Sequence, residues 1–184
     1  MKKIIKNQNG MTLVETLVSI AIFGIISILL VNIFIVAIKT QNRIINTQVV
    51  TEESNYVTEY MTSKIRMAIK DETGDCVGSV SNYSIGTNSI RFLSYDSNSA
   101  TYKCREFFLE DNMIKEKIST DNTSFAFGLA VPLTSSSIIT SNLSFFVIGN
   151  GNEYQTRITT LVSMTKDSSS IKLQTTVSKR ELDL

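Results

Sequence analysis

The most pronounced pattern along the chain is an apolar run close to the N-terminus. From Thr16 to Ile38 the sequence has no charged residue. A helix of this length, at about 1.5 Å per residue, reaches roughly 35 Å and exceeds the roughly 30 Å hydrocarbon core of a bilayer. The run therefore predicts a helix able to span a membrane. Its clearly polar residues are Thr16, Ser19, Ser27 and Asn32.

An amphipathic pattern follows Lys39 without any helix breaker in between. Over residues 40–73 apolar side chains recur at intervals of four or eight, as on one face of a helix. We expect this stretch to pack on a sheet. We also expect it to end near Gly74 and to join the apolar run in one helix of about 60 residues. The recurring positions are Ile45, Val49, Val57, Met61, Ile65 and Ile69.

Beyond Gly74 the period changes to two, which predicts β-strands over about 79–180. Segments rich in Ile, Val, Phe, Tyr and Thr alternate with polar clusters, as antiparallel strands require. The helix-then-sheet order predicts an α+β fold, in which the long N-terminal helix packs on an antiparallel sheet. The expected strands are 89–96, 101–111, 112–119, 142–150, 153–165 and 170–178.

Polar clusters between these segments predict the connections. Residues 110–112, 149–152 and 166–170 have the composition of tight turns. Segment 120–141 is less regular and contains Pro132, the chain's only proline. It predicts a long loop, and a mobile connection is favoured over a surface for a partner.

Charge and composition exclude several function classes. The net charge of +1 gives no excess for binding nucleic acid. Lys103, Arg105, Lys115 and Lys117 are interleaved with Glu106, Glu110 and Glu116. This alternation favours an ordinary exposed strand face, so any nucleic-acid contact is expected to be indirect at most.

Catalytic and ligand-binding patterns are absent from the sequence. There is no histidine, no G-x-S-x-G and no Gly-rich phosphate loop. We therefore expect no enzyme activity, no cofactor, no metal and no small-molecule substrate. The "DSNS" of residues 96–99 lacks the spaced acids of a calcium loop and predicts a solvated turn.

The lysines before the apolar run predict the direction of insertion. Lys2, Lys3 and Lys6 are not accompanied by an acid, so the N-terminus should stay in the cytoplasm and the chain after Lys39 should be exported. Export makes a disulfide between the chain's two cysteines, 76 and 104, possible, with two free thiols as the alternative.

Glu15 distinguishes between the possible N-terminal segments. A secretory signal is excluded, because the apolar run is too long and no A-x-A site follows it. A plain membrane anchor accounts for the length and the lysines. It leaves Glu15 unexplained, because a carboxylate costs about 2.5 to 3.5 kcal/mol at the bilayer centre and less near the interface.

The segment "GMTLVE", Gly10 to Glu15, resembles the processing site of type IV pilins and of the pseudopilins of type II secretion. The resemblance implies that a prepilin peptidase cleaves after Gly10 and methylates the new N-terminus at Met11. Residues 1–10 would be a cytoplasmic leader, 11–39 a transmembrane and assembly helix, and 40–184 an exported domain. Glycine places no side chain in the way of a protease at the cleaved bond.

The same resemblance gives Glu15 a role in assembly, together with Thr12 and Leu13. Glu15 would pair with the N-terminal amine of a neighbouring pilin, and breaking such a desolvated pair costs about 3 to 5 kcal/mol. Many pilins carry a proline midway along this helix. Here there is none, so we expect an unbroken helix, softened at most near Gly24.

The resemblance thus implies a structural subunit of a type IV pilus or of a related secretion or competence filament. The strand pattern after residue 55 is similar to that of the pseudopilin J or W-type minor pilins, which favours a minor subunit. Such a protein first spans the bacterial cytoplasmic membrane once and then enters an extracytoplasmic filament. The alternative is a membrane-anchored, exported binding or sensor domain, which would keep residues 1–10.

Overall fold

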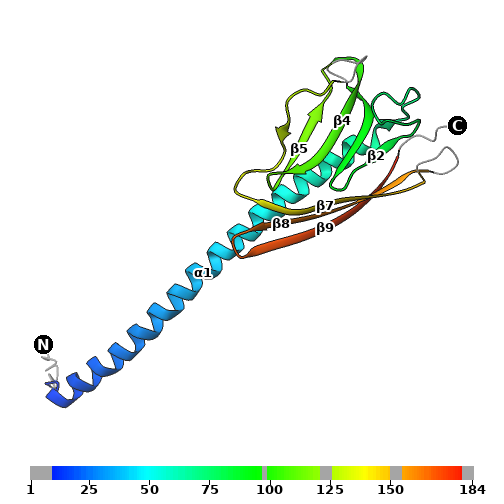
Figure 1. Ribbon diagram of the computed structural model, residues 1–184. Helices are drawn as coiled ribbons and strands as arrows, with labels where there is room; N and C mark the ends of the chain where they lie inside the picture. Colours follow the sequence, from blue (N-terminus) through cyan, green and yellow to red (C-terminus); the bar gives the residue numbers. More distant parts are fainter. Residues whose placement is uncertain (1–9, 97–98, 121–125, 150–154, 180–184) are drawn as a thin grey trace, which may run out of the picture. The chain divides into compact units, whose positions relative to one another are not determined.

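The computed structural model describes residues 10–96, 99–120, 126–149 and 155–179 (Figure 1). Contacts within the molecule divide it into two compact units, Met1–Ile44 and Ile45–Leu184. Helix α1, Leu13–Arg66, contributes to both units. It continues through Gly24 without interruption, as a segment without proline allows.

The first unit contains the N-terminal part of α1 and the apolar run. By length and composition α1 can cross a membrane: its most apolar 18-residue window has a mean hydropathy of 2.9 and no buried residue. The large apolar side chains between Met11 and Ile38 are 44% to 80% exposed. The described part of this unit, residues 10–44, therefore has no hydrophobic core of its own.

The helix ends earlier than the sequence predicts, at Arg66 instead of near Gly74. Met67 closes the last turn by donating its N–H to the carbonyl of Lys64 at 3.2 Å. Ala68 and Ile69 then form strand β1, Ala68–Ile69, and pair with β3. Ile69 fits the helical spacing of the preceding residues, but pairing with a distant strand overrides that local pattern.

The first sheet of the second unit is antiparallel, in the order β1-β3-β4-β5-β6, with β2 also paired to β3. Strand β3 coincides with the predicted segment 89–96, while β1, β2 and β6 were not predicted. Pro132 lies in the edge strand β6, where a missing N–H is tolerated. The remaining bounds are β2 Tyr83–Ile85, β3 Ser89–Asp96, β4 Thr101–Glu110, β5 Met113–Ile118 and β6 Val131–Pro132.

The second sheet contains three long antiparallel strands in the order β7-β8-β9. They are β7 Ile139–Ile148, β8 Arg157–Lys166 and β9 Ser169–Ser178. The ladder between β7 and β8 shifts register between Thr140 and Asn142. The predicted α+β fold is confirmed, with the difference that the strands divide between two sheets.

Two of the predicted turns are tight hairpins. Asp111 and Asn112 connect β4 to β5 with φ of 54° and 59°, the left-handed conformation that suits a two-residue hairpin. Asp167, at φ 50°, opens the turn between β8 and β9. Of the turn predicted at 149–152 only Gly149 is among the described residues. Of the turn predicted at 96–99 only the two ends, Asp96 and Ser99, are described.

The larger of two buried hydrophobic clusters packs the helix against the sheets of the second unit. The C-terminal part of α1 buries Val57, Met61 and Ile65 against both sheets. Ile45, which the sequence places on the same stripe, is 48% exposed. Figure 1 shows β7 running between the first sheet and the rest of the second one. The sheets contribute Phe92, Phe107 and Ile114 on one side and Leu143, Ile158 and Met164 on the other.

Candidate processing and assembly site

The start of α1 is fixed by the side chain of Thr12. Its hydroxyl oxygen accepts a hydrogen bond from the backbone N–H of Glu15 at 3.3 Å. Its carbonyl accepts the N–H of Thr16 at 3.2 Å. Thr12 is therefore the N-cap, and Thr12-x-x-Glu15 is the sequence spacing of a capping box. The resemblance to pilins implies a role in assembly for both residues, and this local role at the start of the helix was not predicted.

Glu15 lies in the first turn of α1 and is exposed. A carboxylate there interacts favourably with the helix dipole, by about 0.3 to 1 kcal/mol. No ion pair of Glu15 is found in the part of the chain that the structure describes. It is the only charged residue from Asn7 to Ile38. The helix thus presents one isolated negative charge at the edge of its apolar surface.

Gly10 and Met11 precede the helix and have no regular secondary structure. Both are exposed, and apart from the chain neighbours of Gly10 no described atom lies within 4 Å of the position that its Cβ would occupy. Leu13 is the most exposed large apolar residue of the N-terminal segment, at 80%. An enzyme can therefore reach the bond after Gly10 without first unfolding any helical turn of α1. The lysines of residues 1–10 lie outside the described residues.

The two cysteines of the chain are joined to each other. Cys76 and Cys104 form a disulfide with a Cα–Cα distance of 5.5 Å. The bond connects the loop after β1 to strand β4 and lies in a small buried cluster with Val77 and Leu93. Of the two alternatives that the sequence left open, the structure has the disulfide.

The basic residues of β4 and β5 do not form the exposed face that the sequence predicts. Arg105 and Glu116 are buried, at 4% and 5% exposure, and form an ion pair with each other. Arg105 also donates through Nε to the hydroxyl of Ser94 at 3.2 Å, and Tyr60 donates its hydroxyl to Glu116 at 2.9 Å. Arg105 shares its strand face with Phe107, two residues on, and that face is the one turned to the core.

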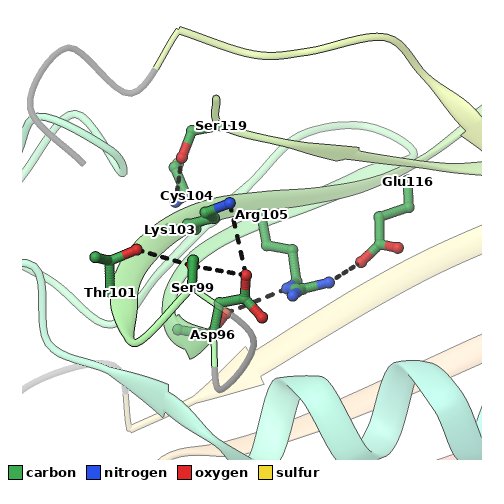
Figure 2. A network of polar contacts seen from close by, with 9 residues as sticks. Asp96, Ser99, Thr101, Lys103, Cys104, Arg105, Glu116 and Ser119 are labelled. Atoms are coloured by element: carbon green, nitrogen blue, oxygen red, sulfur yellow. Dashed lines mark hydrogen bonds and ion pairs between the residues drawn. The ribbon is translucent and has the colours of Figure 1, made fainter. Parts of the chain in front are cut away.

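The remaining cations of this region also have partners. Lys103 pairs with Asp96 at 3.5 Å, and Figure 2 shows this pair beside that of Arg105 and Glu116. Lys115 contacts Glu110 at 3.0 Å, and Lys117 lies over the ring of Phe108. Lys103 and Lys115 thus each have a carboxylate partner, whereas Lys117 contacts an aromatic ring.

Burial and charge together perturb one phenol in this network. Burial raises the pKa of Tyr60, the carboxylate of Glu116 adds to the rise, and Arg105 offsets part of it, so that the pKa reaches about 12. Tyr60 therefore remains a hydrogen-bond donor to Glu116 at physiological pH. Among the described residues no cluster of three or more His, Cys, Asp or Glu side chains could hold a metal ion.

Comparison with known proteins identifies the N-terminal segment. Residues 5–31 match the family model described as the prokaryotic N-terminal methylation motif. No curated protein and no solved structure matches the chain. The match contains the whole of Gly10 to Glu15 and about two thirds of the apolar run. It supports a type IV pilin-like prepilin, a structural protein that is processed by a prepilin peptidase and assembles with other pilins.

Proposed function

Because a methylation motif precedes a pilin-like fold, we propose that this chain is a structural subunit, and a minor one, of a type IV pilus or of a related secretion or competence filament. A prepilin peptidase cleaves it after Gly10 and methylates Met11. Residues 1–10 are the leader, 11–39 the assembly helix and 40–184 the exported domain. The similarity of the strand pattern to pseudopilin J or W-type proteins supports the minor position.

One observation carries the proposal: a single carboxylate stands at the edge of an exposed, charge-free apolar helix, within a methylation motif. Exposed apolar area of this extent marks a surface that is covered by lipid or by partner proteins. The methylation motif favours coverage by lipid first and by partner proteins afterwards. The chain is first anchored in the cytoplasmic membrane, with its N-terminus inside, and then transferred to a filament whose neighbouring helices cover the same surface.

Glu15 sets the axial position of the subunit in this account. Cleavage after Gly10 creates an amine at Met11 in every processed subunit. In the filament, the carboxylate of Glu15 pairs with the N-terminal amine of a neighbour. Two opposite charges removed from water are stable only when they meet, so a misplaced subunit would leave one buried charge unpaired, at a cost of about 3 to 5 kcal/mol.

A second candidate function is a membrane-anchored, exported binding domain. The capping of α1 favours it, because Thr12 and Glu15 already serve the start of the helix without any partner. In that case residues 1–10 would stay on the protein, and Glu15 would remain beside the lipid headgroups.

Substitution of Glu15 tests the assembly role. Glu15→Ala and Glu15→Gln should be processed normally, because the bond after Gly10 and the threonine cap remain. Their amount in sheared filaments should fall by tenfold or more, since the proposed pair is lost in each case. Glu52→Gln, an exposed acid further along the same helix, serves as the matched control. Filaments that contain the Glu15 variants at the wild-type level would refute the pairing.

A further inference from the structure

The hydroxyl groups of the apolar run are satisfied by the helix itself. Thr16 donates to the carbonyl of Leu13 at 2.8 Å, and Ser19 to that of Glu15 at 2.7 Å. The hydroxyl of Ser27 donates in the same way to a carbonyl one turn earlier, at 2.8 Å. These side chains can therefore enter a lipid or protein environment with every hydroxyl proton bonded.

Asn32 is the exception among the polar residues of this run. Its side-chain amide has two N–H donors and an acceptor oxygen, and none has a hydrogen-bond partner among the described residues. Asn32 is exposed and lies six residues before Ile38, which is about 9 Å along a helix. Its short side chain cannot bridge that distance to water, and the bilayer interior supplies no donor or acceptor.

The surface around Asn32 has room for a neighbouring helix. Ser27, Ile28, Val31 and Asn32 line a groove of about 250 Å³ on the surface of α1. Gly24 lies one turn before Ile28, and apart from its chain neighbours and the nearby backbone of its own helix no described atom stands within 4 Å of the position that a Cβ would occupy. Glycine allows two helix backbones to come close, which brings short polar side chains within reach of the other helix.

We propose that Asn32 is an assembly residue: its amide hydrogen-bonds to the apolar N-terminal helix of a neighbouring filament subunit, which lies in the groove beside Gly24. This inference rests on the proposed function, because it takes the partner helix from the filament. Glu15 and Asn32 stand 17 residues apart, roughly 26 Å along the axis. Two polar contacts this far apart fix the axial register, since a slip of one turn breaks both.

The test compares three variants of the full chain in cells with an active prepilin peptidase. Asn32→Leu should be processed normally and should fall about 3-fold to 10-fold in sheared filaments, the range expected for one interhelical hydrogen bond. Asn32→Gln, which keeps the amide, should recover part of the loss. Ser19→Ala is the matched control, because its hydroxyl donates to a carbonyl of its own helix and the residue does not line the groove, and it should behave as wild type. Equal incorporation of Asn32→Leu and wild type would overturn the proposal.

A second measurement separates this inference from the proposed function. A photo-crosslinking residue at position 31, beside Asn32, should capture in the membrane fraction a helix that mass spectrometry identifies by its own methylation motif. The yield should drop in the Asn32→Leu background. If the wild-type chain crosslinks in this way but never enters filaments, the filament function is wrong and the Asn32 contact stands. Crosslinks to lipid alone, or a yield that does not depend on Asn32, would refute the contact.

Discussion

Asp71 organises the loop that follows β1 and carries Cys76. Its buried carboxylate accepts the backbone N–H groups of Cys76 and Val77, each at 2.8 Å. It also accepts the N–H of Gly74 at 3.0 Å and the hydroxyl of Thr73 at 3.1 Å. Burial alone would raise the pKa of Asp71, but these hydrogen bonds outweigh it and hold the pKa below its ordinary 3.8. The ionised form is therefore part of the folded loop.

This arrangement predicts a pH dependence of stability. A group whose pKa is lowered by folding stabilises the protein fully above its ordinary pKa. The contribution is lost as the pH falls from there through the folded-state pKa. Asp71→Asn should therefore cost about 1 to 3 kcal/mol at pH 7, since an amide cannot accept all of these bonds. The difference from wild type in urea unfolding should shrink below pH 4.

Asp75→Asn is the matched control for this experiment. Asp75 is in the same loop, but its side chain is exposed. The substitution should change the free energy of unfolding by less than about 0.5 kcal/mol. A cost for Asp71→Asn that is the same at pH 3 and pH 7 would contradict the role of the carboxylate.

The buried pair of Arg105 and Glu116 gives a second residue-level prediction. Glu116→Gln removes the charge opposite a buried guanidinium, which should destabilise the second unit by about 3 to 5 kcal/mol. Glu110→Gln, which breaks an exposed pair with Lys115, should cost about 0 to 1 kcal/mol. Chemical denaturation of both variants measures the contrast. Equal effects would mean that the buried pair does not support the fold.

At the scale of elements, local patterns predict what local interactions determine. The unbroken helix, the strand at 89–96 and the hairpin at Asp111 each follow from period or turn chemistry in consecutive residues. The end of α1 and the short strands β1, β2 and β6 depend on pairing with distant strands. The sequences of these short strands give no signal of their own. The helical spacing of the apolar residues therefore predicted a helix up to Gly74, past the observed end of α1 at Arg66.

The disulfide is an element-level connection with a measurable contribution. Its cysteines are 28 positions apart, and closing a loop of this size stabilises by about 3.5 kcal/mol in the chain-entropy model. Reduction, or the double variant Cys76→Ser with Cys104→Ser, should lower the free energy of unfolding by about that amount. The double variant should no longer respond to a reductant. An unchanged unfolding curve after reduction would show that the bond adds no stability.

For the whole molecule, the sequence predicts the class of fold better than its arrangement. Alternating segments indicate how many long strands to expect, but their division between two sheets depends on which faces α1 covers. The candidate site shows the same contrast between features that consecutive residues determine and features that only the fold brings together. Gly10, Met11 and Glu15 are recognisable from a motif in consecutive residues. The burial of Arg105 follows from three strands and a helix that meet only in the fold.

The two units have opposite physical characters. The unit Met1–Ile44 presents an apolar helix and no core among its described residues, whereas Ile45–Leu184 has a core, a disulfide and buried polar pairs. A protein of this kind suits anchoring in a membrane followed by assembly into a surface filament. The proposed function requires that the N-terminus is processed before assembly.

Processing is tested most directly by intact-mass and N-terminal peptide analysis of the protein from membranes of cells with an active prepilin peptidase. The account predicts a chain that begins at Met11, carries one methyl group on its amine and lacks residues 1–10. A chain that still begins with the sequence before Gly10 would contradict it. The protein would then be a membrane-anchored exported domain, and Glu15 would have only its local role at the start of α1.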